Sequence, residues 1–279
     1  MARVILCTGR RSKVPLRLHN VNKKLYSLEE ICYYLYHNAS TAEDYLTDMA
    51  LADYFETELG LPEIGKRLRV LKASEAALKE YAEVLFGATR MYTEEEVAEY
   101  MRYMEWLQEL KYWQKQKAKA DAYLEHRNYR EAMGVYERLL QERKENEIPE
   151  NAAGNIYHNL AVCELHVSGA GGACAHFAEA YEKNRSTESL RSYLISLRLA
   201  QKDSEYLNAL EQYEISEQMQ TDIDAMLMES MVEALELPEY RELVRIKKYF
   251  AEGQITEYRH AMKELLDSFK RQYRFDNME

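Results

Sequence analysis

Four residues of the kind that bind zinc lie close together in the sequence, namely Cys163, His166, Cys174 and His176. Zinc needs its ligands to converge in a tetrahedron at distances of about 2.0 to 2.3 Å. The surrounding pattern predicts two consecutive helices, with Cys163 and His166 on the first helix and the other two residues on the second. Cys174 and His176 are two positions apart, so they point about 200° away from each other around their helix. We therefore expect an ordinary helix-pair interior here and no metal.

Three further motifs are incomplete as chemistry. Glu257 and His260 have the Glu-x-x-His spacing of di-iron bundles, but such sites need a second pair and two more glutamates. The glycine-rich residues 168–172 lack the Lys and Ser or Thr of a phosphate-binding loop, so a turn between helices is expected there. Cys7 lies near Arg10, which could activate a thiol, but the position fits the end of a half-buried strand. We expect no catalytic residues, no cofactor and no enzymatic activity.

The composition is typical of a helical protein with a packed core. Ten glycines and four prolines in 279 residues are few, which disfavours all-β folds with their many turns. The four cysteines have no CxxC spacing, which favours a reducing compartment. No apolar run approaches the roughly 18 residues of a membrane span or the roughly 7 to 15 of a signal peptide. An all-α, cytoplasmic protein without membrane insertion is expected.

The net charge of −11 is unevenly distributed along the chain. Residues 1–28 carry seven basic and no acidic residues, so the remainder has a formal charge of −18. An acidic body repels phosphate backbones, which argues against a nucleic-acid partner. We expect the basic leader to dock on this acidic body or on an acidic partner.

Residues 1–110 are predicted to form an N-terminal module that starts with a small β-hairpin. Its two strands are expected at Arg3–Cys7 and Val14–Leu18, with a turn at 9–12 between them. Ser27 followed by Glu30 is a capping box, which predicts the start of the first helix. Further helices are expected over 45–59, from about 64, over 74–86, and from a second capping box at 93 toward 113.

A specific register begins at about residue 115. Ala120 is followed twelve positions later by Ala132, and Ala161 is followed by Ala173 at the same interval. A small residue on each helix lets two antiparallel helices approach closely, and an aromatic residue one turn further fills the gap to the next pair. Those aromatic residues are Tyr136 and Phe177.

This register resembles the tetratricopeptide repeat (TPR) over about residues 115–215. The better unit is matched by Tyr157, Leu160, Ala161, Ala173, Phe177 and Ala180, and the weaker one by Ala120, Tyr123, Tyr129, Ala132 and Tyr136. A third unit near 194–213 has lost both small positions. The spacing of 41 residues between the first two units exceeds the usual 34 and fits a longer loop around 145–149. The resemblance implies a right-handed TPR-like array over 111–279, capped by helices at 221–235 and 255–273.

The resemblance also implies a concave groove lined by the first helix of each pair. The stripe expected to line this groove comprises Gln114, Ala118, Asp121 and Glu125, then Asn155, Asn159, Val162 and His166, then Glu188, Ser192, Ile195 and Leu199. Asn159 matches a position at which the family often places an asparagine that bonds a peptide backbone. The residues expected to bind a peptide or protein are Lys117, Asp121, Asn155, Asn159, Val162, His166 and Ser192.

The sequence thus favours a protein-interaction scaffold that binds a protein or peptide in this groove and that could form a homo-oligomer. One alternative is a peptide-sensing regulator, although no DNA-binding helix-turn-helix is found in residues 1–110. A further alternative is an enzyme with a dispersed site, which a deep pocket with strongly shifted titratable groups would favour.

Overall fold

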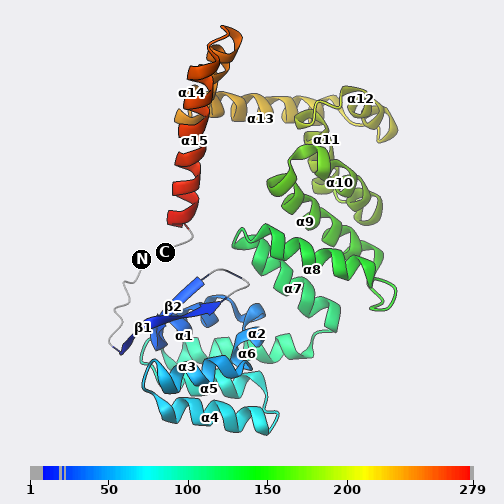
Figure 1. Cartoon of the computed structure of the whole chain (residues 1–279). Coiled ribbons are helices and arrows are strands. Elements are labelled where there is room, and N and C mark those ends of the chain that lie inside the picture. Colours follow the sequence, from blue (N-terminus) through cyan, green and yellow to red (C-terminus); the bar gives the residue numbers. More distant parts are fainter. Residues whose placement is uncertain (1–8, 19–20, 22, 277–279) are drawn as a thin grey trace.

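The computed structural model describes residues 9–18, 21 and 23–276, and these are predominantly helical. The N-terminal elements are β1 (Arg11–Leu18), β2 (Lys23–Ser27), α1 (Leu28–His37), the 3-10 helix η2 (Ala39–Thr41), α2 (Glu43–Leu46), α3 (Met49–Thr57), α4 (Pro62–Ala73), α5 (Leu78–Gly87) and α6 (Glu94–Glu109). They are followed by α7 (Tyr112–Glu125), α8 (Tyr129–Gln141), α9 (Glu150–Ser168), α10 (Ala170–Asn184), α11 (Thr187–Leu199), α12 (Asp203–Gln212), α13 (Glu217–Glu236), α14 (Pro238–Ala251) and α15 (Ile255–Asp276). Figure 1 shows a compact N-terminal unit, a stack of helix pairs on it, and a C-terminal arm.

The hairpin is present, but its described partner strand is not the expected one. Val14–Leu18 lies in β1, which pairs antiparallel with β2, placing Leu16 opposite Leu25. The other expected strand, Arg3–Cys7, lies outside the described residues. The hydroxyl of Tyr54 in α3 donates to the carbonyl of Leu25 at 3.0 Å, which ties β2 to the helical unit. The contact between Tyr54 and Leu25 spans 29 residues and leaves no local pattern in the sequence. Strand β2 was therefore not predicted.

Both predicted capping boxes start helices. The side chain of Ser27 accepts from the backbone N–H of Glu30 at 3.2 Å and caps α1. The carboxylate of Glu30 reaches one residue further back, to the N–H of Tyr26 at 2.6 Å. In α6 the bonds are reciprocal, because Thr93 accepts from the N–H of Glu96 and Glu96 accepts from that of Thr93. These local signals position α1 and α6, which carry two walls of the site.

The expected helix over 45–59 is two helices, α2 and α3. The carboxylate of Asp48 accepts from the N–H of Ala50 at 2.9 Å and caps a new helix inside that range. The next helix begins at Pro62, two residues earlier than expected, because proline suits the first helical position. The helix expected over 74–86 begins only at Leu78.

The helix expected to run from 93 toward 113 stops at Glu109. Leu110 and Lys111 are extended, and the N–H of Lys111 donates to the side chain of Gln114 at 2.9 Å. This side-chain cap starts α7 at Tyr112. The break redirects the chain so that α7 lies across from α6 and can form the opposite wall of a pocket.

From α7 to α12 the helices form successive hairpins, α7–α8, α9–α10 and α11–α12 (Figure 1). The alanines expected at the close contacts are fully buried, and these are Ala120, Ala132, Ala161 and Ala173. Residues 168–172 contain the expected turn, which is a single residue, Gly169, at φ +84°. Residues 142–149 form the longer connection expected before α9.

One hydrophobic cluster runs across residue 110, the expected boundary between the two parts of the chain. It includes Ile31 and Leu85 of the N-terminal unit as well as Tyr136 and Cys163 of the helix pairs. The N-terminal unit and α7–α9 therefore share a core, which holds α6 and α7 in a fixed relation.

The C-terminal helices cap the stack only in part. Ile223, near the start of α13, packs into the cluster of α11 and α12. The rest of α13 leads away from the stack toward α14 and α15, which pack on each other around Ile246, Ala261 and Leu265 (Figure 1). The expected cap over 255–273 is therefore wrong, because those residues cover α14 instead of the last helix pair. Within the described chain, no helix combines the length and apolarity that crossing a membrane requires.

The basic residues of the hairpin do not dock through ion pairs. Arg10 donates to the carbonyl of Gly60 at 3.2 Å, and Arg11 lies 4.9 Å from the ring centre of Tyr26. Among the described basic residues up to position 24, none forms an ion pair with the acidic body.

Candidate functional site

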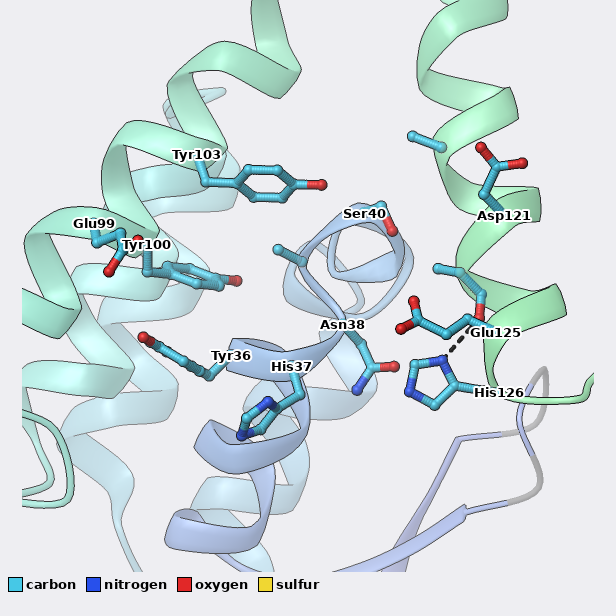
Figure 2. A pocket seen from close by; sticks show the side chains of 13 residues that line it. Tyr36, His37, Asn38, Ser40, Glu99, Tyr100, Tyr103, Asp121, Glu125 and His126 are labelled. Atoms are coloured by element: carbon cyan, nitrogen blue, oxygen red, sulfur yellow. Dashed lines mark hydrogen bonds between the residues drawn. The ribbon is translucent and has the colours of Figure 1, made fainter. Parts of the chain in front are cut away.

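A pocket of about 540 Å³ opens between α1 and η2, α6, and α7 (Figure 2). Its lining residues are Tyr36, His37, Asn38, Ala39, Ser40, Glu99, Tyr100, Tyr103, Ala118, Asp121, Ala122, Glu125 and His126. Three of them, Ala118, Asp121 and Glu125, belong to the stripe expected on the first repeat helix. The pocket therefore lies where that stripe meets the N-terminal unit.

The floor of the pocket is formed where α1 ends. The side-chain amide of Asn38 donates to the carbonyl of Tyr34 at 2.8 Å, and Thr41 donates through its hydroxyl to the carbonyl of Asn38. These bonds end α1 and turn the chain into η2. As a result His37 and Ser40 face the space between α6 and α7 (Figure 2).

An aromatic cluster forms the α6 wall. Tyr36 stacks on Tyr92 and Tyr100, with ring centres 4.3 and 5.6 Å apart, and Phe86 contacts Tyr100 edge to face at 4.9 Å. Tyr103, one turn beyond Tyr100, extends its ring from α6 toward α7 (Figure 2). Because the cluster fixes the rings of Tyr36 and Tyr100, this part of the wall is preformed.

The hydroxyl of Tyr100 is an unsatisfied polar group at this wall. Tyr100 is only 4% exposed, and its hydroxyl has no hydrogen-bond partner among the described residues. Figure 2 shows this hydroxyl directed from α6 toward the floor of the pocket. Burial raises the pKa of Tyr100 above its ordinary value, so the hydroxyl stays protonated.

The α7 wall carries two of the acidic residues of the pocket, Asp121 and Glu125, and Glu99 lies on the α6 wall. Glu125 lies at the mouth, and its carboxylate has no ion-pair or hydrogen-bond partner within the described part of the chain. Beside it, Nδ1 of His126 donates to the carbonyl of Ala122 at 2.8 Å, which leaves Nε2 as an acceptor in the neutral ring. Burial, and secondarily the neighbouring His126, lowers the pKa of His37. No described lysine or arginine lines the pocket, so its walls attract cations.

Asp121, expected to bind a ligand, is held in a network inside the array. It accepts from the hydroxyl of Tyr136 at 2.6 Å, from the amide of Asn159 at 2.9 Å, and from the ammonium of Lys117 at 2.6 Å. Tyr136 is fully buried, and burial together with the charge of Asp121 raises its pKa. Three of the seven expected binding residues thus meet in one cluster, which joins α7, α8 and α9.

The other expected binding residues do not join this cluster. Asn155 accepts from the amide of Asn184 at 3.0 Å, and His166 stacks on Tyr129 with ring centres 4.3 Å apart. Val162 packs beside the buried Ala161, Ala173 and Phe177. Ser192 is half-buried on α11.

The four possible zinc ligands are separated. Burial raises the pKa of the Cys163 thiol to about 12, and Cys174 donates to the carbonyl of Ala170. His176 bonds Glu164 at 2.7 Å, and His166 belongs to the ring stack described above. His260 lies 3.5 Å from Glu264 on an exposed face of α15. Among the residues that the structure describes, no three potential ligands converge on a common point.

One wall of the pocket was predicted from the sequence, and the other two were not. Glu125 and Ala118 followed from the helical stripe, whereas Tyr100, Tyr103 and His37 lie in other elements that only the fold brings together. The abundance of tyrosine, 23 residues, was the one available signal, since tyrosine suits half-buried walls. In the described pocket neither histidine bonds a hydroxyl or a thiol.

Comparison with protein families, with curated proteins and with solved structures yields no match for this chain.

Proposed function

We propose that this protein is an interaction scaffold that binds a segment of another protein, and that a basic side chain of that segment anchors in the pocket between α1, α6 and α7. The observation that carries the proposal is the pairing of an unneutralised carboxylate, Glu125, with a preformed tyrosine wall across the opening. Catalysis is not part of the proposal.

The stack of helix pairs supports a scaffold role. A TPR-like, right-handed array would explain why Ala120, Ala132, Ala161 and Ala173 are all fully buried at helix contacts. Gly154 supports the same close approach, because a Cβ built there would lie 2.6 Å from the Cβ of Asn184 in α10. Such arrays leave the first helix of each pair open to a ligand, and α7 is the helix that borders the pocket.

A basic side chain fits the chemistry of the walls. Its ammonium or guanidinium group would pair with Glu125 at the mouth, where solvent still screens the charge and keeps the gain modest. Its alkyl stem and cation would contact the ring of Tyr103, and one of its N–H groups could donate to Nε2 of His126, which is an acceptor in the neutral ring. An acidic side chain would instead meet Glu99 and Glu125 as like charges.

The array would guide the rest of the segment. Asn159 uses its amide N–H groups on Asp121 and Tyr136, so it is not free to donate to a peptide. Its carbonyl oxygen can still accept from a peptide N–H. The proposal therefore gives Asn159 a secondary role and makes Glu125 the principal determinant.

A selection from a random peptide library displayed on phage tests the proposal with the full chain as bait. Recovered peptides are expected to share a lysine or arginine at one position, and changing it to norleucine should weaken binding about tenfold, which corresponds to about 1.4 kcal/mol. Glu125→Gln removes only the screened ion pair, so it should weaken binding of the parent peptide about two- to fivefold and change binding of the norleucine peptide little.

Glu131→Gln is the matched control. Glu131 is exposed on α8, away from the pocket, so this substitution removes the same charge without changing the pocket. It should bind like the parent. Recovery of peptides that share no basic residue would refute the basic anchor. If no two selected peptides compete with each other for binding, a single dedicated binding surface would be refuted.

A further inference from the structure

The C-terminal arm, defined as α13, α14 and α15, carries more than half of the exposed large hydrophobic side chains of the described chain. Twelve of the exposed large hydrophobic side chains lie between 228 and 269, and they are Met228, Met231, Val232, Leu235, Leu237, Tyr240, Leu243, Val244, Phe250, Ile255, Leu266 and Phe269. A concentrated apolar surface of this kind marks an interface.

On α13 the exposed residues form one regular stripe. Met228, Met231, Val232 and Leu235 follow one another at spacings of three, one and three, which places them on a single face. Their exposure ranges from 42% to 71%, and Ile223 is the one fully buried residue described on this helix. The stripe thus has the pattern of a helix that packs against another helix, without a partner inside the chain.

The two helices α13 and α14 carry opposite charges beside their apolar stripes. On α13, Glu229, Glu233 and Glu236 each follow a stripe residue by one position, and α13 has six acidic and no basic residues. On α14, Arg241 and Arg245 each follow an exposed apolar residue, Tyr240 and Val244, by one position, and Arg245 also pairs with Glu242 on the same helix. The acidic line of α13 and the basic line of α14 therefore each lie one position after the apolar residues of their own helix. Each line flanks its apolar face on the same side, viewed along the chain.

We propose that the arm is the dimer interface of this protein, with α13 of one copy packed antiparallel against α14 of a second copy. In an antiparallel pair, lines with the same offset fall on the same side of the contact, so the acidic line of α13 meets the basic line of α14. The occupant is a second copy because the arm itself supplies both complementary faces.

The geometry of the arm satisfies the two-fold symmetry that such a dimer needs. A single extended residue, Leu237, joins α13 and α14, so the two helices of one chain turn away from each other and cannot lie side by side (Figure 1). A two-fold rotation that places α13 against the partner's α14 also places the partner's α13 against α14. Each contact is thereby made twice, as in isologous dimers.

Light scattering coupled to size exclusion tests the interface on the full chain. Over about 1 to 100 µM the parent should have twice the monomer mass of 32.9 kDa, whereas Val232→Glu should raise the dimer dissociation constant by at least about 100-fold. Leu207→Glu is the matched control, because Leu207 is 60% exposed on α12, outside the arm, and should leave the dimer intact.

A charge-reversal experiment separates the proposed contact from any other dimer. Glu229→Lys with Glu233→Lys makes α13 basic, and Arg241→Glu with Arg245→Glu makes α14 acidic. Each double variant alone should be monomeric because both contacts become like-charged, and a mixture of the two should form heterodimers because both contacts become complementary.

A parent that stays monomeric at about 100 µM, or a dimer that survives both charge reversals, would overturn the proposal. Circular dichroism on each variant checks the fold, which should be unchanged because every substituted side chain is exposed.

Discussion

The network around Asp121 yields a quantitative prediction for the stability of the array. Asp121→Ala removes the acceptor of the Tyr136 hydroxyl, which lies 2.6 Å away on a fully buried ring. A buried hydroxyl left without an acceptor costs about 1 to 3 kcal/mol, and bonds to a charged acceptor lie toward the upper end. The ion pair with Lys117 adds less than about 1 kcal/mol, because the two side chains are 24% and 39% exposed. We expect Asp121→Ala to lower the free energy of unfolding by about 2 to 3 kcal/mol.

Tyr136→Phe should cost less, about 1 kcal/mol, because the partly exposed Asp121 keeps its bonds to Asn159 and Lys117. In the double variant no hydroxyl is left unpaired, so the two losses should not add. The expected coupling free energy is about 1 kcal/mol.

Urea unfolding followed by circular dichroism on the parent, both single variants and the double variant measures this cycle. Lys117→Ala is the control for the exposed part of the network and should cost less than about 1 kcal/mol. Additivity of the two single changes to within about 0.3 kcal/mol would refute the reasoning, since it would mean that the hydroxyl and the carboxylate do not depend on each other.

Three further predictions test other parts of the structure. Phe177→Ala, in the buried cluster with Ala161 and Ala173, should lower the free energy of unfolding in urea by about 3 to 5 kcal/mol. Gly154→Ala should cost about 1 to 3 kcal/mol because its Cβ would meet backbone atoms of α10 at 2.7 and 2.9 Å, whereas Gly134→Ala, with nothing within 4 Å, should stabilise the chain by up to about 1 kcal/mol in the same assay. Burial lowers the pKa of both His37 and His158 below 6.5 in the folded chain. As the pH falls, these histidines are therefore protonated in the unfolded chain before they are protonated in the folded chain. The stability present above pH 6.5 should therefore be lost progressively below it, and the thermal midpoint should be lower at about pH 5.5 than at about pH 7.5, with a smaller difference in His158→Gln.

Local signals explain how much of the fold could be predicted. Capping boxes act over three residues, so Ser27 and Thr93 identified two helix starts directly. The twelve-residue interval between alanines reports contact between adjacent helices, and all four alanines are buried as expected. Asp48 shows the limit of such reasoning, because its cap splits a continuous apolar pattern that otherwise predicts a single helix.

The site could be predicted only in part because its walls come from distant segments. Glu125 and Tyr103 face one pocket although 22 positions separate them, and His37 lies a further 66 positions before Tyr103. The apolar stripe of α13 was visible as a helical pattern, but the sequence cannot show that the helix leaves the stack and stays exposed.

Two acidic residues one turn apart on α7 separate folding from recognition. Asp121 is neutralised by Lys117 and serves as acceptor for two side chains, so its loss acts first on the packing of α7 against α8 and α9. Glu125, four residues later, has no partner among the described residues and faces the tyrosine wall, so its loss leaves those contacts intact. Because both side chains lie on the same stripe, a ligand that follows the helix passes both. A change at Glu125 that weakens binding without altering stability therefore identifies the pocket as the working surface more clearly than any change at Asp121 or Asn159.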